Sequence, residues 1–563
     1  MKKQDQHWWD KLGEPQYGDE IVIRSSGNIT NFDPYFIEGL TTIQSAWMER
    51  PIADDWTTDP KEWDYRMHFR FDPYVKGHLA ESVEFPDSTT WILHLRKGIH
   101  WQDIPPVNGR EFTADDVAYH YHRLFGLGSG FTQPSAYHAN VVTAYRDLIS
   151  VTAVDRYTVV FRWKTPYLEP MRETLQAPTN AACLEAREAV EKWGDVSDWH
   201  HAVGTGPFIL KDFVDGVSAT LVRNPNYWGY DERHPQNQLP YIDQLKFKII
   251  LDDDDALHAM ARGEVDVMDG LTYHQYLKLK KLNPDILWLA VPASGAETIA
   301  PRNDVKPFTD IRVRMAMQMA LDLPAIAKNY YGGTVDPHPC ALTSRYMTGW
   351  GWPYEQWPQD LKDEYAYNPV RAKQLLAEAG YPHGFKTNIA TDKMGDMGLL
   401  EVAKLYFAQV GIDMEIRKME TDDWIRDVKK GHKHDQISHR TGQGQLGQDM
   451  EPLRQLNPLL ADYVSNFSRI VDPAAGEFYN KCLKTNTMDE MKQVLRDANE
   501  YCARQHFLIS LLHPVKYYPY QPWLKGYNGQ FYSIATGTGG PALLYFYPAR
   551  FWIDQKLKKS MGH

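Results

Sequence analysis

The sequence of 563 residues has no uninterrupted apolar run of the roughly 18 residues that a membrane-spanning helix requires. Its first residues, MKKQDQHWWDKLGEPQYGDEIVIRS, include the basic start of a secretion signal but not the apolar segment that should follow it. This start fits either a cytosolic protein or an exported protein whose signal has been removed.

Long basic runs are also missing, and cysteines are scarce. The chain has 61 Lys and Arg against 73 Asp and Glu, a formal net charge of -12, and the basic residues form no long run. An extended nucleic-acid surface is therefore excluded. The four cysteines, Cys183, Cys340, Cys482 and Cys502, are widely separated and form no CxxC pair. They permit at most two disulfides and identify no pairing, so buried inert thiols are the favoured interpretation.

The common catalytic signatures are missing as well. There is no GxSxG, no GxxxxGK[ST] and no HExxH. The four aspartates at 252–255 lack the spacing of a calcium loop and are better explained as an acidic helix start. His432, His434 and His439 are close enough in sequence to hold a metal or a haem-like cargo, although solvated loop histidines are favoured. We expect neither an enzyme nor a bound cofactor.

Aromatic residues, in contrast, are abundant, with 18 Trp, 33 Tyr and 21 Phe. Most of them fill cores, but Tyr and Trp also form the walls of ligand sites, because their rings stack and their polar ends donate hydrogen bonds.

The pattern of predicted elements indicates an α/β fold with mixed β-sheets. A strand is expected at 20–26, two strands within 204–229, and a strand at 245–251 followed by a helix at 255–262 and a strand from Val265. Helices are expected where capping residues precede periodic segments. These helices begin after Thr113, Asp310 and Asn368, and another helix precedes a strand within 400–420.

The chain contains, in this order, the segments TTWILHLRKGIHWQD, GREFTADDVAYHYHRL, GTGPFIL, VRNPNYWG, ALHAMARGEVDVM, KPFTDIRVRMAMQMALD, YNPVRAKQLLAEAGYP, VGIDMEIRKME and YQPWLKGYNG. Together these segments resemble one family, the extracytoplasmic solute-binding proteins of peptide-type ABC importers (family 5, the oligopeptide, dipeptide and nickel group). They occur in the family's order and cover most of residues 20 to 530.

The resemblance implies a two-lobed periplasmic-binding-protein clamp, of the large type II class, with mixed sheets flanked by helices. The first lobe is expected to comprise residues 1–45, 200–298 and 512–563, with an extra domain at 46–199 inserted in it, and the second lobe 299–511. Such a protein is expected to be a periplasmic or other extracytoplasmic monomer. It captures an oligopeptide or a similar polar solute and delivers it to membrane permease subunits.

One loop departs from the family's pattern. In peptide binders a second-lobe loop reads roughly Gly-Trp-x-x-Asp-x-x-Asp/Glu-Pro, in which the Trp lines the cleft and the first Asp pairs with the ligand's α-amine. In GQLGQDMEP, at 444–452, the Trp position falls on Gln445 and the Asp position on Gln448. Neutral amides suit a neutral oligosaccharide or an opine-like solute better than a buried ammonium group. Alternatively, a one-residue slip makes Asp449 the anchor.

The resemblance and the neighbouring residues supply the other candidate ligand contacts. Asn31, Phe32 and Asp33 follow the first strand, where this family meets its ligand, although Asn-Phe-Asp-Pro is also a good turn. Trp424 and Arg440 flank the glutamine-rich loop, to which Gln443 also belongs. Metal-chelate or haem binding, or a hydrolase on this fold, are the remaining alternatives.

Overall fold

The computed structural model divides the chain into two compact units, which are described separately. The first comprises Met1–Tyr65, Arg70–Val291 and Tyr517–His563, and the second Arg66–Phe69 and Pro292–Lys516. The three-part division expected from the resemblance stays a prediction. The structure describes residues 7–36, 43–59, 61–62, 75–135, 148–164, 182–293, 295–343, 349–439, 452–463, 466–527 and 548–563.

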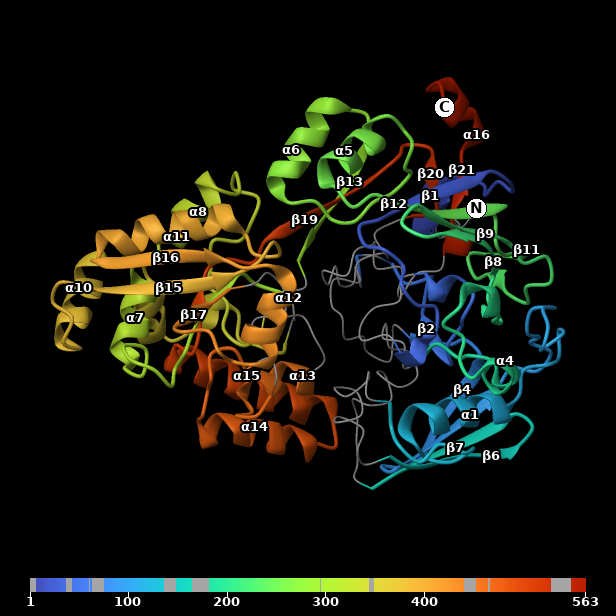
Figure 1. Cartoon of the computed structure of the whole chain (residues 1–563), viewed down its shortest axis with the longest axis horizontal. Coiled ribbons are helices and arrows are strands. Elements are labelled where there is room, and N and C mark those ends of the chain that lie inside the picture. Colours follow the sequence, from blue (N-terminus) through green and yellow to red (C-terminus); the bar gives the residue numbers. More distant parts are fainter. Residues whose placement is uncertain are drawn as a thin grey trace, which may run out of the picture. The chain divides into compact units, whose positions relative to one another are not determined.

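The centre of the first unit is a mixed four-stranded sheet with the order β1-β12-β9-β8 (Figure 1). Its strands are β1 (Glu20–Ser25), β8 (Phe208–Val214), β9 (Ser218–Arg223) and β12 (Gln244–Ile249). β1 and β12 run parallel, whereas the other neighbours are antiparallel. Ile21 and Ile23 of β1 are completely buried, as the alternation of apolar residues predicts. The predicted strands at 20–26, within 204–229 and at 245–251 are confirmed.

The strand expected from Val265 is much shorter than predicted. Only Val267 pairs, in isolated bridges to Ile23 of β1 and to Tyr520. The helix before it, α5 (Asp253–Ala261), begins as predicted in the aspartate run, where the Asp252 side chain accepts a hydrogen bond from the Asp255 N–H. The acidic run is therefore a helix cap, stabilised by the positive end of the helix dipole.

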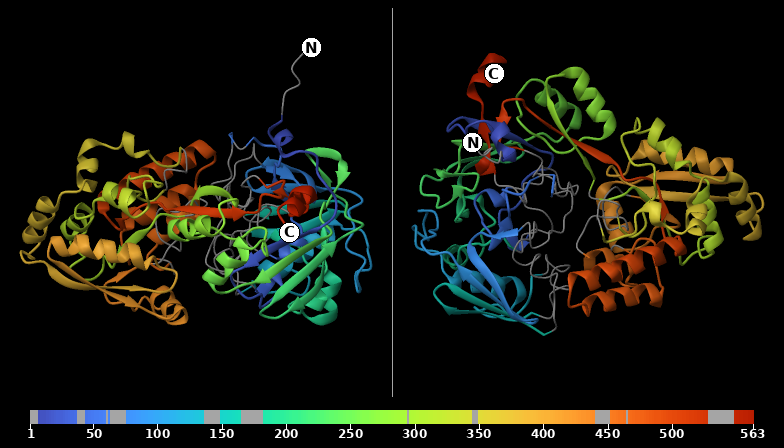
Figure 2. Two further views of the ribbon diagram at one scale, coloured as in Figure 1. Left: turned by 90° about the horizontal axis from the view of Figure 1, so that it is seen from above. Right: turned by 180° about the vertical axis from the view of Figure 1, so that it is seen from behind.

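A second sheet of the first unit, antiparallel with the order β4-β5-β7-β6, packs against helix α1 (Figure 2). The elements are β4 (Ala80–Asp87), β5 (Thr90–Leu95), β6 (Leu148–Asp155), β7 (Thr158–Trp163) and α1 (Ala114–Phe125). Thr113 and Asp116 form the capping box at the start of α1, and Gly126, with φ of 70°, ends it. The helix predicted after Thr113 is confirmed.

The first unit also contains shorter strands and helices. The strands are β2 (Ile52–Asp54), β3 (Val75–Gly77), β10 (Tyr230–Asp231), β11 (His234–Gln238), β20 (Leu524–Lys525) and β21 (Trp552–Ile553). The helices are α4 (Arg187–Trp193), α6 (Tyr273–Leu282) and α16 (Gln555–Ser560). Strands β13 (Leu287–Pro292) and β19 (Val515–Tyr520) form a two-stranded sheet. They contain two of the positions where the chain passes from one unit to the other, after Val291 and after Lys516.

The second unit is built on a mixed five-stranded sheet with the order β16-β15-β17-β14-β18. Its strands are β14 (Thr298–Pro301), β15 (Phe385–Thr391), β16 (Ile412–Lys418), β17 (Ile437–Ser438) and β18 (Ile509–Ser510). β15 runs parallel to β16 and β17, and helix α11 (Met397–Gln409) connects β15 to β16 (Figure 1). The helix and the strand that the sequence predicts within 400–420 are confirmed as α11 and β16.

The helices of the second unit begin mostly at capped positions. They are α7 (Ile311–Met319), α8 (Leu323–Asn329), α9 (Gln359–Tyr365), α10 (Pro369–Glu378), α11 (Met397–Gln409), α12 (Thr421–Asp423), α13 (Pro452–Leu456), α14 (Pro473–Leu483) and α15 (Met488–Gln505). Asp310 and Asn368 accept N–H bonds at the starts of α7 and α10, and Pro369 occupies the first turn. Both predicted starts are confirmed.

Two further expectations concern the cysteines and the membrane. All four cysteines are buried, and none of them is in a disulfide, which confirms the interpretation as buried thiols. Among the described helices, none combines the length and the apolar character needed to cross a bilayer.

Candidate functional site

The segment after β1 forms a turn stabilised by its own side chains. Asn31 Oδ1 accepts a hydrogen bond from Asp33 N at 2.8 Å, and Asp33 Oδ1 accepts one from Tyr35 N at 2.9 Å. Phe32 is only 3% exposed and packs edge-on against Phe213, with ring centroids 5.0 Å apart. These contacts give the segment the turn structure that its Asn-Phe-Asp-Pro sequence favours.

The Asp33 carboxylate is completely buried in an ion-pair network. Arg123 of α1 donates to both of its oxygens, at 3.0 and 2.7 Å, and also to Glu185 at 3.1 Å. His120 is 2.5 Å from the other Glu185 oxygen. Burial alone would raise the pKa of Glu185, but His120 and Arg123 lower it to about 2. Both carboxylates thus have cationic or donor partners inside the protein, and the structure gives Asp33 a structural role. Ligand contact by Asn31, Phe32 and Asp33 stays a prediction.

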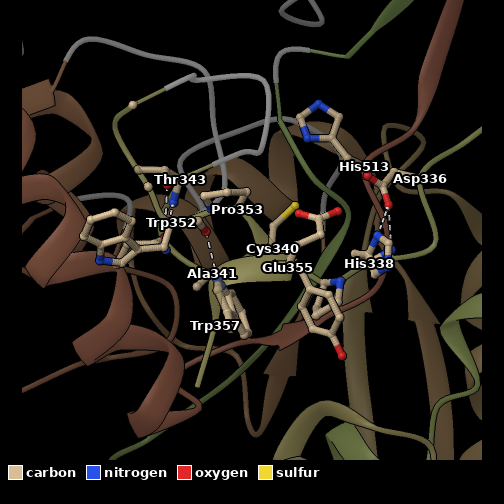
Figure 3. Close-up of a pocket in the computed structure, with 15 residues that line it drawn as sticks. Asp336, His338, Cys340, Ala341, Thr343, Trp352, Pro353, Glu355, Trp357 and His513 are labelled. Carbon is tan, nitrogen blue, oxygen red and sulfur yellow. Dashed lines mark hydrogen bonds and ion pairs between the residues drawn. The ribbon is translucent and has the colours of Figure 1, made fainter. Parts of the chain in front are cut away.

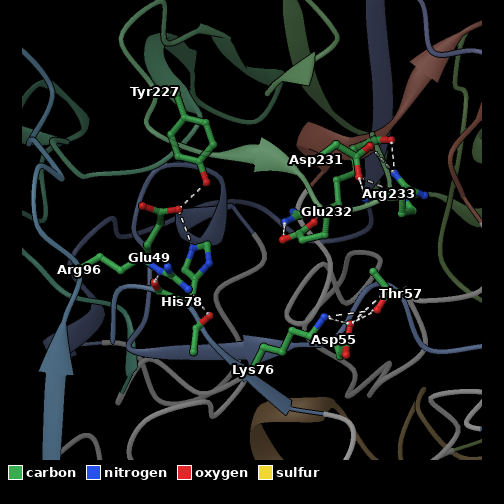
Figure 4. A network of polar contacts seen from close by, with 12 residues as sticks. Glu49, Asp55, Thr57, Lys76, His78, Arg96, Tyr227, Asp231, Glu232 and Arg233 are labelled. Atoms are coloured by element: carbon green, nitrogen blue, oxygen red, sulfur yellow. Dashed lines mark hydrogen bonds and ion pairs between the residues drawn. The ribbon is translucent and has the colours of Figure 1, made fainter. Parts of the chain in front are cut away.

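A second buried carboxylate of the first unit, Glu49, is also surrounded by donors (Figure 4). Its oxygens lie 2.7 Å from His78 Nε2, 2.7 Å from the Tyr227 hydroxyl and 2.9 Å from Trp228 Nε1. A carboxylate with three donors around it is well satisfied and has little capacity left to accept a proton from a substrate. The cluster therefore joins the chain at residue 49 to residues 78 and 227–228 and offers no exposed base.

The structure describes only some of the residues that the sequence predicts as ligand contacts in the second unit. Arg440, Gln443, Gln445, Gln448 and Asp449 lie outside the described residues, and their role as ligand contacts stays a prediction. Trp424 begins the π-helical segment η9 (Trp424–Lys430) and is completely buried. It packs against Phe467, with ring centroids 5.4 Å apart, in a core cluster of the unit. The structure thus gives Trp424 a core role.

The three histidines that precede the loop at 444–452 do not point to a common site. His432 accepts a hydrogen bond from Arg469 at 2.9 Å, His434 is 3.1 Å from the Phe467 carbonyl, and His439 is 2.9 Å from the Thr298 carbonyl. The expectation of solvated loop histidines is wrong for two of them, since His434 and His439 are buried. They occupy the core because strand β17 carries the segment across the sheet. In the described part of the chain, no group of three or more His, Cys, Asp or Glu could hold a metal.

The second unit contains a cavity of about 170 Å³ that is lined by residues of 336–343 and 349–357, by Asn499 of helix α15 and by His513, two residues before β19 (Figure 3). Its lining is Asp336, His338, Pro339, Cys340, Ala341, Thr343, Gly349, Gly351, Trp352, Pro353, Tyr354, Glu355, Trp357, Asn499 and His513.

The aromatic residues of this lining support one another. The Tyr354 ring stacks on His338 with centroids 4.6 Å apart and lies 5.4 Å from Trp357. Trp357 Nε1 donates to the Trp352 carbonyl at 2.9 Å. The aromatic wall of the cavity is therefore formed by neighbouring rings that pack on, or are hydrogen-bonded by, the buried Trp357. The side chain of Trp352 is 40% exposed.

The polar part of the lining is acidic in character. Asp336 Oδ1 accepts from the His338 backbone N–H at 2.9 Å and lies 2.6 Å from the His338 ring. Glu355 is exposed, and the described lining contains no Lys or Arg. Burial lowers the pKa of His513 to about 4, so this side chain is neutral near pH 7.

Sequence reasoning missed this cavity entirely. The aromatic and glycine run GWGWP at 349–353 is the one local signal that pointed to a ligand wall. Asn499 and His513 lie far along the chain and carry no such signal.

The sequence model of the family described as bacterial extracellular solute-binding proteins, family 5 (middle region), matches residues 74–458, more than half of the chain. The chain belongs to family 5 of the bacterial extracellular solute-binding proteins. This confirms the resemblance stated above and the expected fold class.

Individual relatives match this family 5 protein over most of their length. The glutathione-binding protein GsiB of Shigella flexneri serotype 5b is 25% identical over 509 residues, which are 88% of each chain. The periplasmic binding protein DppA of Helicobacter pylori, solved with the peptide STSA, has a TM-score of 0.72 at 20% identity and covers 97% of this chain and 99% of its own. AgaA of A. tumefaciens R10, solved with agropinic acid, has a TM-score of 0.69 at 17% identity over 95% of this chain and 99% of its own.

Proposed function

We propose that this family 5 protein is the substrate-binding receptor of an ABC importer, which captures a short peptide or a polar solute of similar size and delivers it to the membrane permease. The observation that carries the proposal is the family match over residues 74–458. Similarity to a glutathione-binding protein over 88% of the chain supports a small peptide as the ligand.

We propose binding without catalysis. The buried carboxylates of the first unit support this, because Asp33, Glu49 and Glu185 are each satisfied by donors of the protein. A general base needs an accepting atom within reach of the substrate proton, and these atoms are already occupied. The separate partners of His432, His434 and His439 speak against a haem or metal-chelate cargo at that segment.

A second ligand class, a neutral oligosaccharide or an opine-like solute, is favoured by one feature. Gln448 stands where peptide binders of this family carry the aspartate that pairs with the ligand's amine. A neutral amide compensates a buried ammonium less well than a carboxylate does. The structural neighbour AgaA, solved with agropinic acid, is an example of this fold with a non-peptide ligand.

The proposal includes the location and the partners. We expect a periplasmic or other extracytoplasmic monomer that associates with the membrane through the permease subunits. The first lobe would be formed by residues 1–45, 200–298 and 512–563, the inserted domain by 46–199 and the second lobe by 299–511.

Native mass spectrometry of the purified protein, followed by denaturation, identifies any ligand that is retained. Titration calorimetry then compares peptides of about two to five residues with oligosaccharides of similar mass. A ligand at a free concentration of about 100 times its Kd stabilises the folded protein by about 2.7 kcal/mol, so binding raises the Tm.

Pairs of peptides with free and acetylated N-termini test the anchoring of the amine. With Gln448 at the anchoring position, we expect acetylation to weaken binding less than about 10-fold, because a neutral contact of about 1 kcal/mol is at stake. A loss of about 100-fold or more would assign the anchor to a carboxylate such as Asp449. If neither peptides nor sugars bind, the proposed function is wrong.

A further inference from the structure

In the side chain of Asn499, in α15, the amide oxygen accepts hydrogen bonds from the protein, whereas the amide nitrogen donates none to the described residues. Oδ1 accepts from the Thr343 backbone N–H at 2.9 Å and from the Thr343 hydroxyl at 3.1 Å. Because a backbone N–H can only donate, the accepting atom must be the oxygen, and the orientation of the amide follows. The NH₂ group is therefore directed away from Thr343.

This NH₂ group makes no hydrogen bond to any residue that the structure describes, although Asn499 is only 3% exposed. Asn499 is part of the cavity lining of the second unit. Nδ2 is not one of the buried polar atoms that lack a partner, so it is accessible from the cavity that Asn499 lines. A group that enters the cavity with an accepting oxygen can take a hydrogen bond from this nitrogen in place of water.

The walls limit what that group can be. Trp352, Tyr354 and Trp357 offer ring faces and edges, and Pro339 and Pro353 add further apolar surface. The volume of about 170 Å³ is below the roughly 300–1,000 Å³ of a complete small-molecule site, which suits one side chain and not an entire ligand. The carboxylates of Asp336 and Glu355 disfavour an anionic group.

We propose that this cavity is a specificity pocket for an aromatic ligand side chain that carries an accepting oxygen, as tyrosine does. The ring packs against Trp352, Tyr354 and Trp357, and the hydroxyl oxygen accepts a hydrogen bond from Asn499 Nδ2. The exposed carboxylate of Glu355, in the same lining, is an acceptor for the hydroxyl proton. The inference rests on the proposed peptide-binding function and adds the side chain that the peptide must offer.

The first test leaves the protein intact and changes the ligand. Calorimetry on the wild-type protein compares peptides of about two to five residues that differ only in Tyr, Phe or Ala at each position in turn. At one position we expect Tyr to bind about 10-fold more tightly than Phe, because Phe leaves the donor unpaired, and Phe more tightly than Ala.

Two variants then distinguish the contribution of the Asn499 hydrogen bond to peptide binding from that of the aromatic wall. Asn499→Ala should abolish the preference for Tyr over Phe while Phe still binds better than Ala. Trp352→Ala should weaken Tyr and Phe peptides to a similar degree and leave Ala peptides unchanged. Trp352 is 40% exposed, so this variant is expected to fold even if the loss of Asn499 destabilises the unit.

Controls come from the same unit. Tyr367→Ala removes a ring of comparable exposure, 39%, outside the cavity, and Asn480→Ala removes an exposed amide on α14. Both should bind every peptide as the wild type does. Peptide binding with equal affinity for Tyr and Phe at every position overturns this inference alone. A protein that binds no peptide of any composition overturns this inference together with the peptide class of ligand. If it binds no oligosaccharide either, the proposed function is wrong as well.

Discussion

The two units hold their buried polar groups in different ways. In the first unit, buried charges meet opposite charges: Arg123 contacts Asp33 and Glu185, and Arg233 contacts Asp231. In the second unit, buried polar side chains mostly meet backbone carbonyls. His434 and His513 lie 3.1 and 2.5 Å from carbonyl oxygens, and Arg314 donates to three of them, those of Phe308, Gln505 and His506.

The difference has consequences for stability. An ion pair loses its compensation when one partner is removed, because the other charge stays buried. A neutral side chain bonded to a carbonyl can be replaced by another neutral donor at low cost, but it resists protonation. We therefore expect the first unit to be sensitive to charge deletion and the second to acid.

The largest effect is expected for Arg123→Met. The substitution leaves Asp33 and Glu185 buried without their cation, which should lower the free energy of unfolding by about 3–5 kcal/mol. Urea denaturation measures the loss. Arg426→Met in the second unit is the matched control, because the Arg426 side chain is 63% exposed in its contacts with Asp423 and Asp427. Solvent screens such pairs, so this variant should lose much less stability than Arg123→Met. Equal losses in both variants would remove the contrast between the units.

Acidification should affect the second unit next. Burial, with a smaller contribution from Arg302, lowers the pKa of His434 to about 4. The folded state thus binds fewer protons than the unfolded chain, and the stabilisation is complete above about pH 6.5 and is lost as the pH falls through about 4. Asp266 of the first unit behaves oppositely, since burial raises its pKa to about 6. Its contribution is complete below about pH 3.9 and is lost as the pH rises through about 6.

His434→Gln tests this opposition. Glutamine can still donate to the Phe467 carbonyl, so we expect a change of about 1 kcal/mol or less near neutral pH. Between about pH 7 and about pH 4.5 the variant should lose about 2 kcal/mol less than the wild type in urea denaturation. An unchanged acid dependence would show that His434 is protonated in the folded state.

The smallest effect on stability is expected for Gln448→Ala. We expect ligand binding to weaken by about 10-fold, as for one neutral contact at a binding site, while the Tm of the unliganded protein stays the same. Gln359→Ala, an exposed amide at the start of α9, is the control for calorimetry. Unchanged binding would show that the glutamine-rich loop does not contact the ligand.

Local signals predicted much of the fold. Asp310 and Asn368 cap helices because each side chain accepts a hydrogen bond from a backbone N–H a few residues later. At the start of α1 the Asp116 side chain accepts from the Thr113 N–H, and such local contacts can be read from the sequence. The strands β1 and β12 follow from apolar alternation for the same reason.

Contacts between distant residues could not be predicted in this way. The buried ion pair of Asp33 could not be predicted from the sequence, because its partner Arg123 lies 90 residues away. His434 and His439 looked solvated because the polar residues around them hide their burial. The donor of Asn499 depends on Thr343, 156 residues earlier, so no local pattern contains the pocket.

The discontinuous first unit has a consequence for the way the protein is made. A ribosome releases Pro292–Lys516 before Tyr517–His563, so the second unit has all of its residues while the first still lacks its last segment. Until that segment arrives, the buried Asp266 lacks the donor that Trp523 supplies at 2.6 Å, and Asp19 lacks Lys558. The second unit can thus finish folding before the first, and a chain interrupted between Lys516 and Tyr517 is incomplete in the first unit alone.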